Sequence, residues 1–175
     1  PPGMEAGLEA VDYYDPPNLT FPFGSYICVV DIDRGTGEVK VRRFVAVDDC
    51  GNIINPMIVD GQVHGGVAQG IGAALYEEII YNEDGQLVTG SLADYLVPTA
   101  MEIPHMEVHH VEGESPTTLG GFRGMGEGGT IGAPAAIANA LSDALSPLGI
   151  GITELPATPD RIFRLVMAAR KGGAG

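Results

Sequence analysis

Residues 25–48, SYICVVDIDRGTGEVKVRRFVAVD, decide how the chain begins to fold. Two runs rich in β-branched residues, Ser25–Asp33 and Glu38–Asp48, flank the short connection Arg34–Gly37. β-Branched and aromatic side chains favour strands, and a short connection that contains glycine is typical of a hairpin. These residues therefore predict a β-hairpin at the start of the folded part.

Three stretches further along the chain have apolar residues at helical spacing: Met57–Ile80, Thr130–Leu145 and Pro159–Ala169. The second begins with a threonine able to cap it, and the third begins with a proline directly after the capping residue Thr158. In the first, glycines leave one face nearly bare, which favours close packing against a neighbour; they are Gly61, Gly65, Gly66, Gly70 and Gly72.

Polar and apolar residues alternate from His105 to Glu112, which predicts a further strand. Strands that come early, a glycine-faced helix and further helices behind a long loop indicate an α+β fold. The expected division is an extended, proline-containing lead-in at residues 1–24, one folded domain at 25–170 and a loose tail at 171–175.

The composition limits the classes of partner. The chain has 175 residues, of which 45% are apolar, and a formal net charge of −14, which argues against nucleic acid and anionic membranes as partners. No apolar run has the length of a membrane span and no signal peptide is recognisable, so a cytoplasmic location is expected. The two cysteines, Cys28 and Cys50, do not make a disulfide framework, and both are expected to be reduced.

The glycine-rich run 120–132, GGFRGMGEGGTIG, holds one carboxylate, Glu127, just ahead of a predicted helix. Such a loop can adopt left-handed dihedrals, approach a ligand closely and direct successive N–H groups at an anion. Arg123 and the helix dipole would place positive charge near Glu127. The alternative is a tight turn with a solvated glutamate.

Other patterns allow more than one interpretation. Residues 124–129 match G-x-G-x-x-G, but a loop precedes them and an acid lies among the glycines, so a dinucleotide site of the Rossmann type is disfavoured. His105, Glu107 and His109 would share one strand face; a solvated polar face explains them better than a metal site. His64 would either touch a ligand or serve packing. No hydrolase motif supports nucleophilic catalysis.

Four motifs together resemble the C-terminal part of the molybdenum-binding large subunit of the xanthine oxidase family, above all its carbon monoxide dehydrogenase and aldehyde-oxidising groups. They are residues 49–56, 61–72, 95–98 and 124–129. The resemblance runs from about Ser25 to Ala169. It implies a molybdenum-cofactor-binding domain in which a mixed sheet packs against helices.

The resemblance also implies a cofactor and a set of site residues. The cofactor is molybdopterin with molybdenum, in its cytosine dinucleotide form, and no protein side chain ligates the metal. Glu127 matches the family's general base for oxidation of a small carbon substrate (CO, aldehyde or heterocycle) with water as the oxygen source. Gln62, otherwise interpretable as a surface glutamine, matches the residue that hydrogen-bonds the pterin. The remaining cofactor-binding positions are Cys50, Gly51, Asn52, Asn55, Gly124, Met125 and Gly126.

The family's large subunit is several times longer than 175 residues. The resemblance therefore implies partners: the rest of the large subunit, and iron–sulfur and flavin subunits that carry 2Fe–2S clusters and FAD. It follows that the chain alone is expected to be inactive. The competing hypothesis is a non-catalytic module that kept the fold and only binds cofactor or partner chains.

Overall fold

The computed structural model describes residues 7–172, which form a small sheet and three α-helices. Along the chain the elements are β1 (Phe23–Ile32), β2 (Val39–Asp49), α1 (Pro56–Leu75), β3 (Met106–His110), α2 (Gly128–Leu145), a short 3-10 turn η1 (Ser146–Leu148) and α3 (Pro159–Gly172). The predicted hairpin and the α+β class are confirmed, and the strand bounds differ from the predicted ones by one or two residues.

The sheet is mixed, with strand order β1-β2-β3. β1 runs antiparallel to β2, whereas β3 returns after α1 and pairs parallel to β2, with Phe44 opposite Met106. The register shifts within the hairpin, because Val29 pairs with Arg43 but Val30 pairs with Val41. Arg42 is thus an extra residue, a β-bulge, and the buried side chains of Val41 and Phe44 keep the same face of the sheet.

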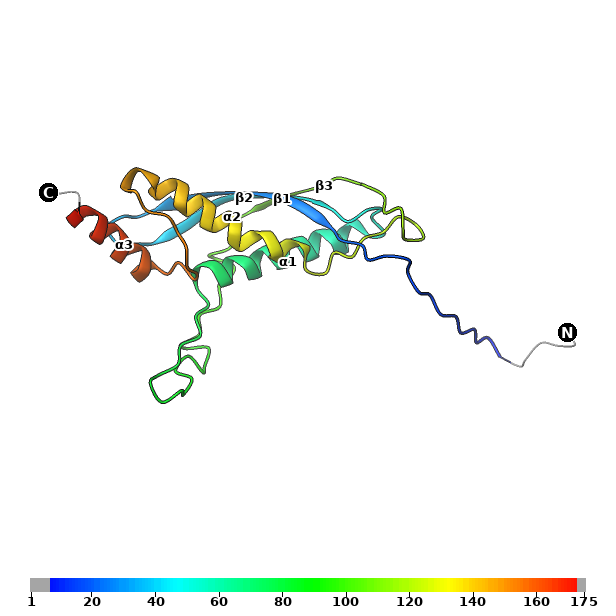
Figure 1. Cartoon of the computed structure of the whole chain (residues 1–175), viewed down its shortest axis with the longest axis horizontal. Coiled ribbons are helices and arrows are strands. Elements are labelled where there is room, and N and C mark those ends of the chain that lie inside the picture. The colour runs from blue at the N-terminus through cyan, green and yellow to red at the C-terminus, as the bar shows by residue number, and fades with distance from the viewer. Residues whose placement is uncertain (1–6, 173–175) are drawn as a thin grey trace, which may run out of the picture.

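α1 and α2 cross on one face of the sheet, and α3 lies next to η1 at one end of the molecule (Figure 1). The core is formed between the sheet and these helices, and its largest fully buried apolar side chains are Phe44, Val63, Val67, Ile71, Ile137, Leu141, Leu145, Ile162 and Val166. In β1 the even-numbered residues point toward this core, while Ile27 and Val29 are exposed on the opposite face.

α1 and α2 touch through their backbones. A Cβ atom added at Gly66 would lie 2.7 Å from the amide nitrogen of Thr130, and one at Gly129 would lie 2.6 Å from the carbonyl oxygen of Val63. Both distances are far shorter than normal contacts, so each position needs glycine for steric reasons. The close packing predicted from the glycine face is confirmed here, whereas Gly61 and Gly65 face open space.

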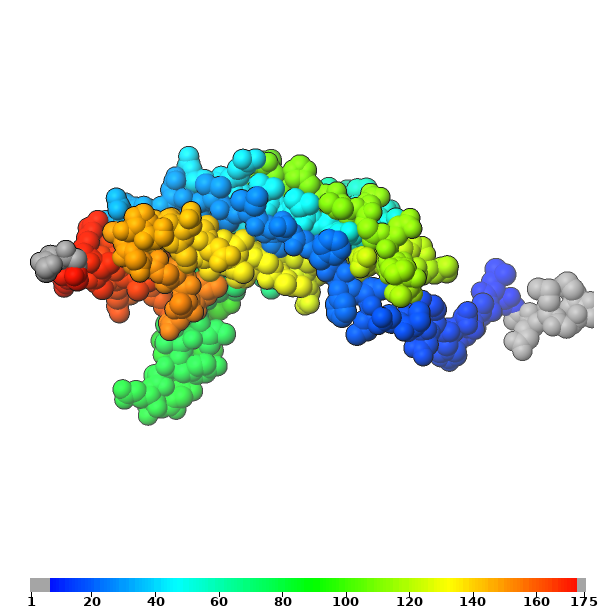
Figure 2. All heavy atoms as spheres, turned by 45° about the horizontal axis from the view of Figure 1, so that its top comes forward, coloured from blue at the N-terminus to red at the C-terminus, as the bar shows by residue number. Residues whose placement is uncertain are grey.

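Several helix bounds were predicted wrongly. α1 ends at Leu75 instead of Ile80, because the amides of Tyr76 and Glu77 both donate to the carbonyl of Gly72 and close the helix. The β-branched Ile80 instead enters an irregular excursion, where its carbonyl accepts from the amide of Val88. This excursion spans residues 76–105, and its middle part projects from the body of the molecule (Figures 1 and 2), whereas Tyr76 and Ile103 near its ends pack against the core.

The second wrong bound is the start of α2. The helix begins at Gly128, so Thr130 lies inside it and Glu127 occupies the capping position. For α3 the predicted start is confirmed: Pro159 is the first helical residue, and the Thr158 hydroxyl accepts from the amide of Arg161 at 3.5 Å. The predicted end at Ala169 is wrong, because the helix continues to Gly172. The expected strand at 105–112 is present in shortened form as β3.

Residues 7–22 form an arm that leads away from the sheet without helix or strand (Figure 2). The first six residues of the expected lead-in and residues 173–175 of the expected tail lie outside the described chain, and α3 continues to Gly172. Within residues 7–172 no helix is both long and apolar enough to cross a membrane.

The helix contact predicts opposite effects for two neighbouring glycines. Gly66→Ala introduces a methyl group against the backbone of Thr130, and we expect it to lower the free energy of unfolding by about 1–3 kcal/mol. Gly65→Ala is the matched control in the same helix turn, where nothing lies within 4 Å of the added atom, and it should raise this free energy by about 0.4–1 kcal/mol. Denaturant unfolding of the assembly that contains the chain measures both. Equal effects of the two substitutions would contradict the packing described.

Both cysteines are free thiols, and burial raises the pKa of Cys28 to about 11. We therefore expect iodoacetamide at pH 8 to alkylate Cys28 about 100-fold more slowly than an ordinary thiol, since only the thiolate reacts. The matched control is Ser25→Cys in a Cys28→Ala background, because Ser25 is exposed on the opposite face of the same strand. Mass spectrometry over time measures both rates on the 175-residue chain, in which this face of β1 is uncovered, and equal rates would rule out the protected thiol.

Candidate functional site

Two loops far apart in the sequence lie side by side at one end of the sheet. The amide of Arg123 donates to the carbonyl of Cys50 at 2.7 Å, and Gly51 and Phe122 form an antiparallel bridge. The side chain of Asn52 adds a bond, because its Nδ2 donates to the carbonyl of Gly120 at 2.7 Å. The loop after β2 and the glycine-rich loop before α2 therefore form one frame.

Several predicted cofactor-binding residues have structural duties within this frame. Gly51 has φ +70°, and a Cβ there would lie 2.0 Å from the carbonyl oxygen of Gly121, so only glycine fits. Cys50 is buried in the core, and this burial raises the pKa of its thiol, with the nearby carboxylates of Asp49 and Asp48 acting in the same direction. The Cys50 side chain thus belongs to the core.

Asn55 caps α1, since its side-chain oxygen accepts from the amide of Ile58 at 3.4 Å. A cavity of about 300 Å³ opens beside this cap, between the two loops and the first turn of α1. Its lining is mostly apolar and includes four of the predicted residues: Cys50, Asn52, Asn55 and Met125. The cavity does not include Gln62 or Glu127.

Gln62 is exposed on α1, two turns after the cap, and its amide makes no hydrogen bond within the described chain. Its neighbour Val63 is buried and lies against Gly129 at the helix contact. The backbone contact between α1 and α2 thereby places the turn of α1 that carries Gln62 against the first turn of α2, which follows Glu127.

Glu127 combines a fixed backbone with a free side chain. Its carbonyl accepts from the amides of Thr130 at 3.1 Å and Ile131 at 3.3 Å, which starts α2. Its carboxylate makes no capping bond and is exposed. A carboxylate held at this point, with no partner in residues 7–172, is available to an external group.

Gly124 and Gly126, which precede Glu127 in the loop, are not required by the packing of this chain. A Cβ at Gly124 or Gly126 would meet nothing within 4 Å, and neither residue has a positive φ. The expected left-handed conformation occurs instead at Gly120 and Gly121. Met125 between the two glycines anchors the loop, because its side chain is buried against Gly128.

Arg123 stabilises the frame and makes no described contact with Glu127, contrary to the expectation. Its Nε donates to the carbonyl of Gly113 at 3.1 Å and its Nη1 donates to that of Phe21 at 3.1 Å. The guanidinium also lies 3.9 Å from the buried carboxylate of Asp49. Arg123 therefore ties the loop to the start of β1.

Glu107 and His64, which belong to the histidine patterns considered above, both have partners within the chain. Glu107 pairs with Arg43, whose Nη2 donates to the carboxylate at 2.7 Å and lowers the pKa of Glu107. His64 is exposed, and its Nδ1 lies 2.7 Å from the carbonyl oxygen of Asp60 in its own helix. No three His, Cys, Asp or Glu side chains in residues 7–172 are grouped to hold a metal ion.

The sequence did not single out Asp48 and Tyr26, which meet at the start of α2. The Tyr26 hydroxyl lies 2.6 Å from both the carboxylate of Asp48 and the carbonyl oxygen of Gly128. Burial raises the pKa of both side chains. One signal was available: Asp48 continues the inward-pointing series of β2 after Phe44 and Ala46, which places a carboxylate at a core position.

Comparison with known proteins identifies the family of the chain. Residues 3–104 match the family model described as a molybdopterin cofactor-binding domain. The chain is 47% identical over 94% of its length to the carbon monoxide dehydrogenase large chain of Hydrogenophaga pseudoflava, and 48% identical over 94% of its length to the nicotine 6-hydroxylase large subunit of Paenarthrobacter nicotinovorans. It spans about a fifth of the length of each of these curated relatives, 20% in both cases.

Solved structures show the same fold. A crystal structure of the Cu,Mo-CO dehydrogenase superposes with a TM-score of 0.91 at 44% identity, covering 97% of this chain and 21% of that one. The quinoline 2-oxidoreductase of Pseudomonas putida 86 gives 0.90 at 49% identity, covering 95% and 21%. The chain therefore belongs to the molybdopterin cofactor-binding domains of the xanthine oxidase family of molybdenum hydroxylases.

Proposed function

We propose that this chain is the part of a molybdenum hydroxylase that holds the molybdopterin cofactor and supplies Glu127 as the general base. The observation that carries the proposal is the arrangement of the glycine-rich loop, α1 and α2. It leaves the side chains of Glu127 and Gln62 without a partner in residues 7–172. Glu127 and Gln62 are both exposed and unbonded within residues 7–172, although the backbones beneath them are fixed by the contact of α1 and α2. Side chains that the fold positions but does not use are suited to an external group.

The loop has the donors that a phosphate-bearing cofactor needs. No acceptor in the described chain binds the amides of Gly124, Met125, Gly126 or Glu127. The open space over Gly124 and Gly126 lets a group approach this backbone closely. A chain with a net charge of −14 would hold phosphate through such amides more readily than through clustered cations.

The remaining predicted residues complete the cofactor assignment. Cys50, Asn52 and Asn55 would line the dinucleotide, taken as the cytosine form, along the cavity beside α1, and Gly51 would bind it from its place in the same loop. The side chains of Asn52 and Asn55 already make hydrogen bonds within the chain, and Gly51 has no side chain. These residues would therefore define the shape of the binding surface more than they would bind the cofactor through side-chain groups. The Gln62 amide offers both donors and an acceptor to the edge of a pterin.

When bound, the molybdenum cofactor supplies the redox chemistry by which oxygen from water is transferred to a small carbon substrate. The role of Glu127 is to accept a proton at a carboxylate oxygen during this transfer. Because Glu127 directly precedes α2, its carboxylate is presented at the positive end of the helix dipole. We propose carbon monoxide, an aldehyde or a nitrogen heterocycle as the substrate.

Exposed apolar surface supports the proposed partners. The outer face of β1 exposes Ile27 and Val29, and the first turn of α1 exposes Met57 and Ile58. Further large apolar side chains are exposed on the excursion 76–105, among them Ile79, Tyr81, Leu92 and Met101. We propose that the rest of a large subunit covers these surfaces, that iron–sulfur and flavin subunits carry 2Fe–2S and FAD, and that the chain alone is inactive. A cytoplasmic location remains a prediction from the sequence.

Replacing the proposed base tests the central step. In the assembled enzyme, Glu127→Gln should lower kcat by about 10²–10⁴-fold, because an amide cannot accept the proton. Molybdenum content, measured by mass spectrometry of the metal, should stay unchanged. Glu114→Gln is the matched control, since Glu114 is another exposed glutamate of the same loop. Unchanged turnover in Glu127→Gln would remove Glu127 from the mechanism and favour the non-catalytic alternative.

The proposed pterin contact gives a separate prediction about binding. Gln62→Ala removes one or more hydrogen bonds, each worth about 0.5–1.5 kcal/mol, so the cofactor should dissociate about 2–10-fold more readily. Cofactor retained after extended dialysis of the assembled enzyme measures this change. Gln69→Ala serves as the control, because Gln69 is also an exposed glutamine of α1. Equal retention in the two variants would refute the assignment of Gln62.

A further inference from the structure

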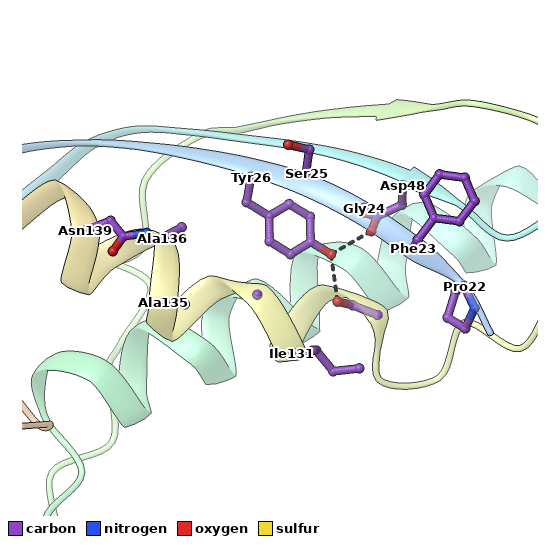
Figure 3. A pocket seen from close by; sticks show the side chains of 12 residues that line it. Pro22, Phe23, Gly24, Ser25, Tyr26, Asp48, Ile131, Ala135, Ala136 and Asn139 are labelled. Carbon is purple, nitrogen blue, oxygen red and sulfur yellow. Dashed lines mark hydrogen bonds between the residues drawn. The ribbon is translucent and has the colours of Figure 1, made fainter.

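The hydroxyl of Tyr26 lies between two oxygen atoms that both normally accept hydrogen bonds. It is 2.6 Å from the carbonyl oxygen of Gly128 and 2.6 Å from Oδ1 of Asp48, and Figure 3 shows the Tyr26 hydroxyl between Asp48 and the start of α2, with one dashed line to each. A phenol has a single proton to donate, and a carbonyl oxygen has none. If Tyr26 donates to Gly128, its second contact is favourable only when Asp48 carries a proton and donates it to the phenol oxygen.

The surroundings of Asp48 favour the neutral acid. Asp48 is 2% exposed, and its Oδ2 atom has no hydrogen-bond partner among the described residues. Arg123 is turned to the neighbouring Asp49 instead, and Cys50 is a buried thiol. Desolvation raises the pKa of Asp48, against smaller opposing effects of Tyr26 and His110.

His110 is the remaining titratable group that faces Asp48. It is the pairing partner of Asp48 in the parallel register of β2 and β3. Its Nε2 lies 2.7 Å from Oδ1 of Asp60 on α1, so this carboxylate already accepts the bond that His110 can make through Nε2. His110 thus has its own acid partner and is not hydrogen-bonded to Asp48 within the described chain.

Two glycines make room for the pair. A Cβ at Gly24 would lie 2.4 Å from Oδ1 of Asp48, and a Cβ at Gly132 would lie 2.5 Å from Cδ2 of Tyr26. Neither glycine has a positive φ, so the need for glycine at both positions is steric. Any larger residue at either position would displace the contact between the sheet and the first turn of α2.

We propose that Asp48 is held as a neutral acid which donates to Tyr26, and that this pair positions Glu127 by fixing the peptide of Gly128. The carbonyl of Gly128 follows Glu127 directly in the chain, at the first residue of α2. A hydrogen bond to this oxygen resists rotation of the helix start and hence reorientation of the Glu127 backbone. Asp48 and Tyr26 are positioning residues in this scheme, and their effect on turnover rests on the proposed function of Glu127.

Infrared spectroscopy of the assembled enzyme at pH 7 tests the protonation state without turnover. The carbonyl stretch of a protonated carboxylic acid, identified by its shift in D₂O, should be present in the native protein and absent from Asp48→Asn. Asp49→Asn is the matched control, which should leave the band unchanged: Asp49 is equally buried, but its carboxylate accepts from the amide of Gly51 and faces Arg123. An unchanged band in Asp48→Asn would overturn the proposal.

Kinetics test the positioning role. Tyr26→Phe should lower kcat by about 10-fold or more at unchanged molybdenum content and KM. The reason is that a small misplacement of a catalytic group slows the chemical step without weakening substrate binding. Asp48→Ala should do the same, and Asp48→Asn should restore most of the loss, because its Nδ2 can donate to Tyr26 as the neutral acid does. If Asp48→Asn is as slow as Asp48→Ala, the neutral donor is refuted. A silent Glu127→Gln would instead refute the proposed function and leave the infrared result intact.

Discussion

The backbone contact between α1 and α2 is the constraint on which the site depends. Gly66 and Gly129 face each other with no side chain between the helices, so the distance and the relative rotation of the helices are set by main-chain atoms. Side-chain repacking cannot relax such a contact. The chain uses this rigidity to place the exposed Gln62 of one helix beside the start of the other, where Glu127 lies.

The loop frame adds a second fixed point. The bridge between Gly51 and Phe122 and the bond from Arg123 to the Cys50 carbonyl join the end of β2 to the glycine-rich loop. Glu127 is thereby held from both sides, by the frame before it and by α2 after it. The frame satisfies the polar groups of its own loops but leaves the amides at 124–127 without acceptors in the described chain. Structural and ligand-binding duties are thus divided between neighbouring residues of the same loop.

The parts of the fold that depend on local sequence were predictable. The hairpin follows from β-branched runs around a glycine turn, and α3 follows from its cap, its first proline and its apolar spacing. The parallel pairing of β3 was not predicted, because it depends on a contact between distant segments. The end of α1 at Leu75 was not predicted either, because the closing bonds from Tyr76 and Glu77 to Gly72 leave no signal in the apolar spacing. The apolar spacing alone could not show that the carbonyl of Ile80 accepts a hydrogen bond from the amide of Val88 in the excursion instead of continuing the helix.

The same division holds for the candidate site. Glu127 was recognisable from its glycine neighbours, whereas Gln62 became a candidate only through the family resemblance, since an exposed glutamine carries no signal of its own. Arg123 was assigned by nearness in sequence, but in the fold its hydrogen bonds go to Gly113 and Phe21. The meeting of Tyr26 with Gly128 joins β1 to α2, and no spacing rule connects positions so far apart in the chain.

The bulge in β2 has a consequence for how the strand tolerates changes of length. It turns two consecutive cations outward, and each meets an acid of a different neighbouring strand: Arg42 pairs with Asp31 of β1 and Arg43 with Glu107 of β3. Deleting Arg42 would restore strict alternation between Val41 and Phe44 and leave every core side chain on its face. A deletion elsewhere in β2 would invert the faces beyond it. The bulge is therefore the position where natural insertions and deletions in this strand should concentrate among related sequences.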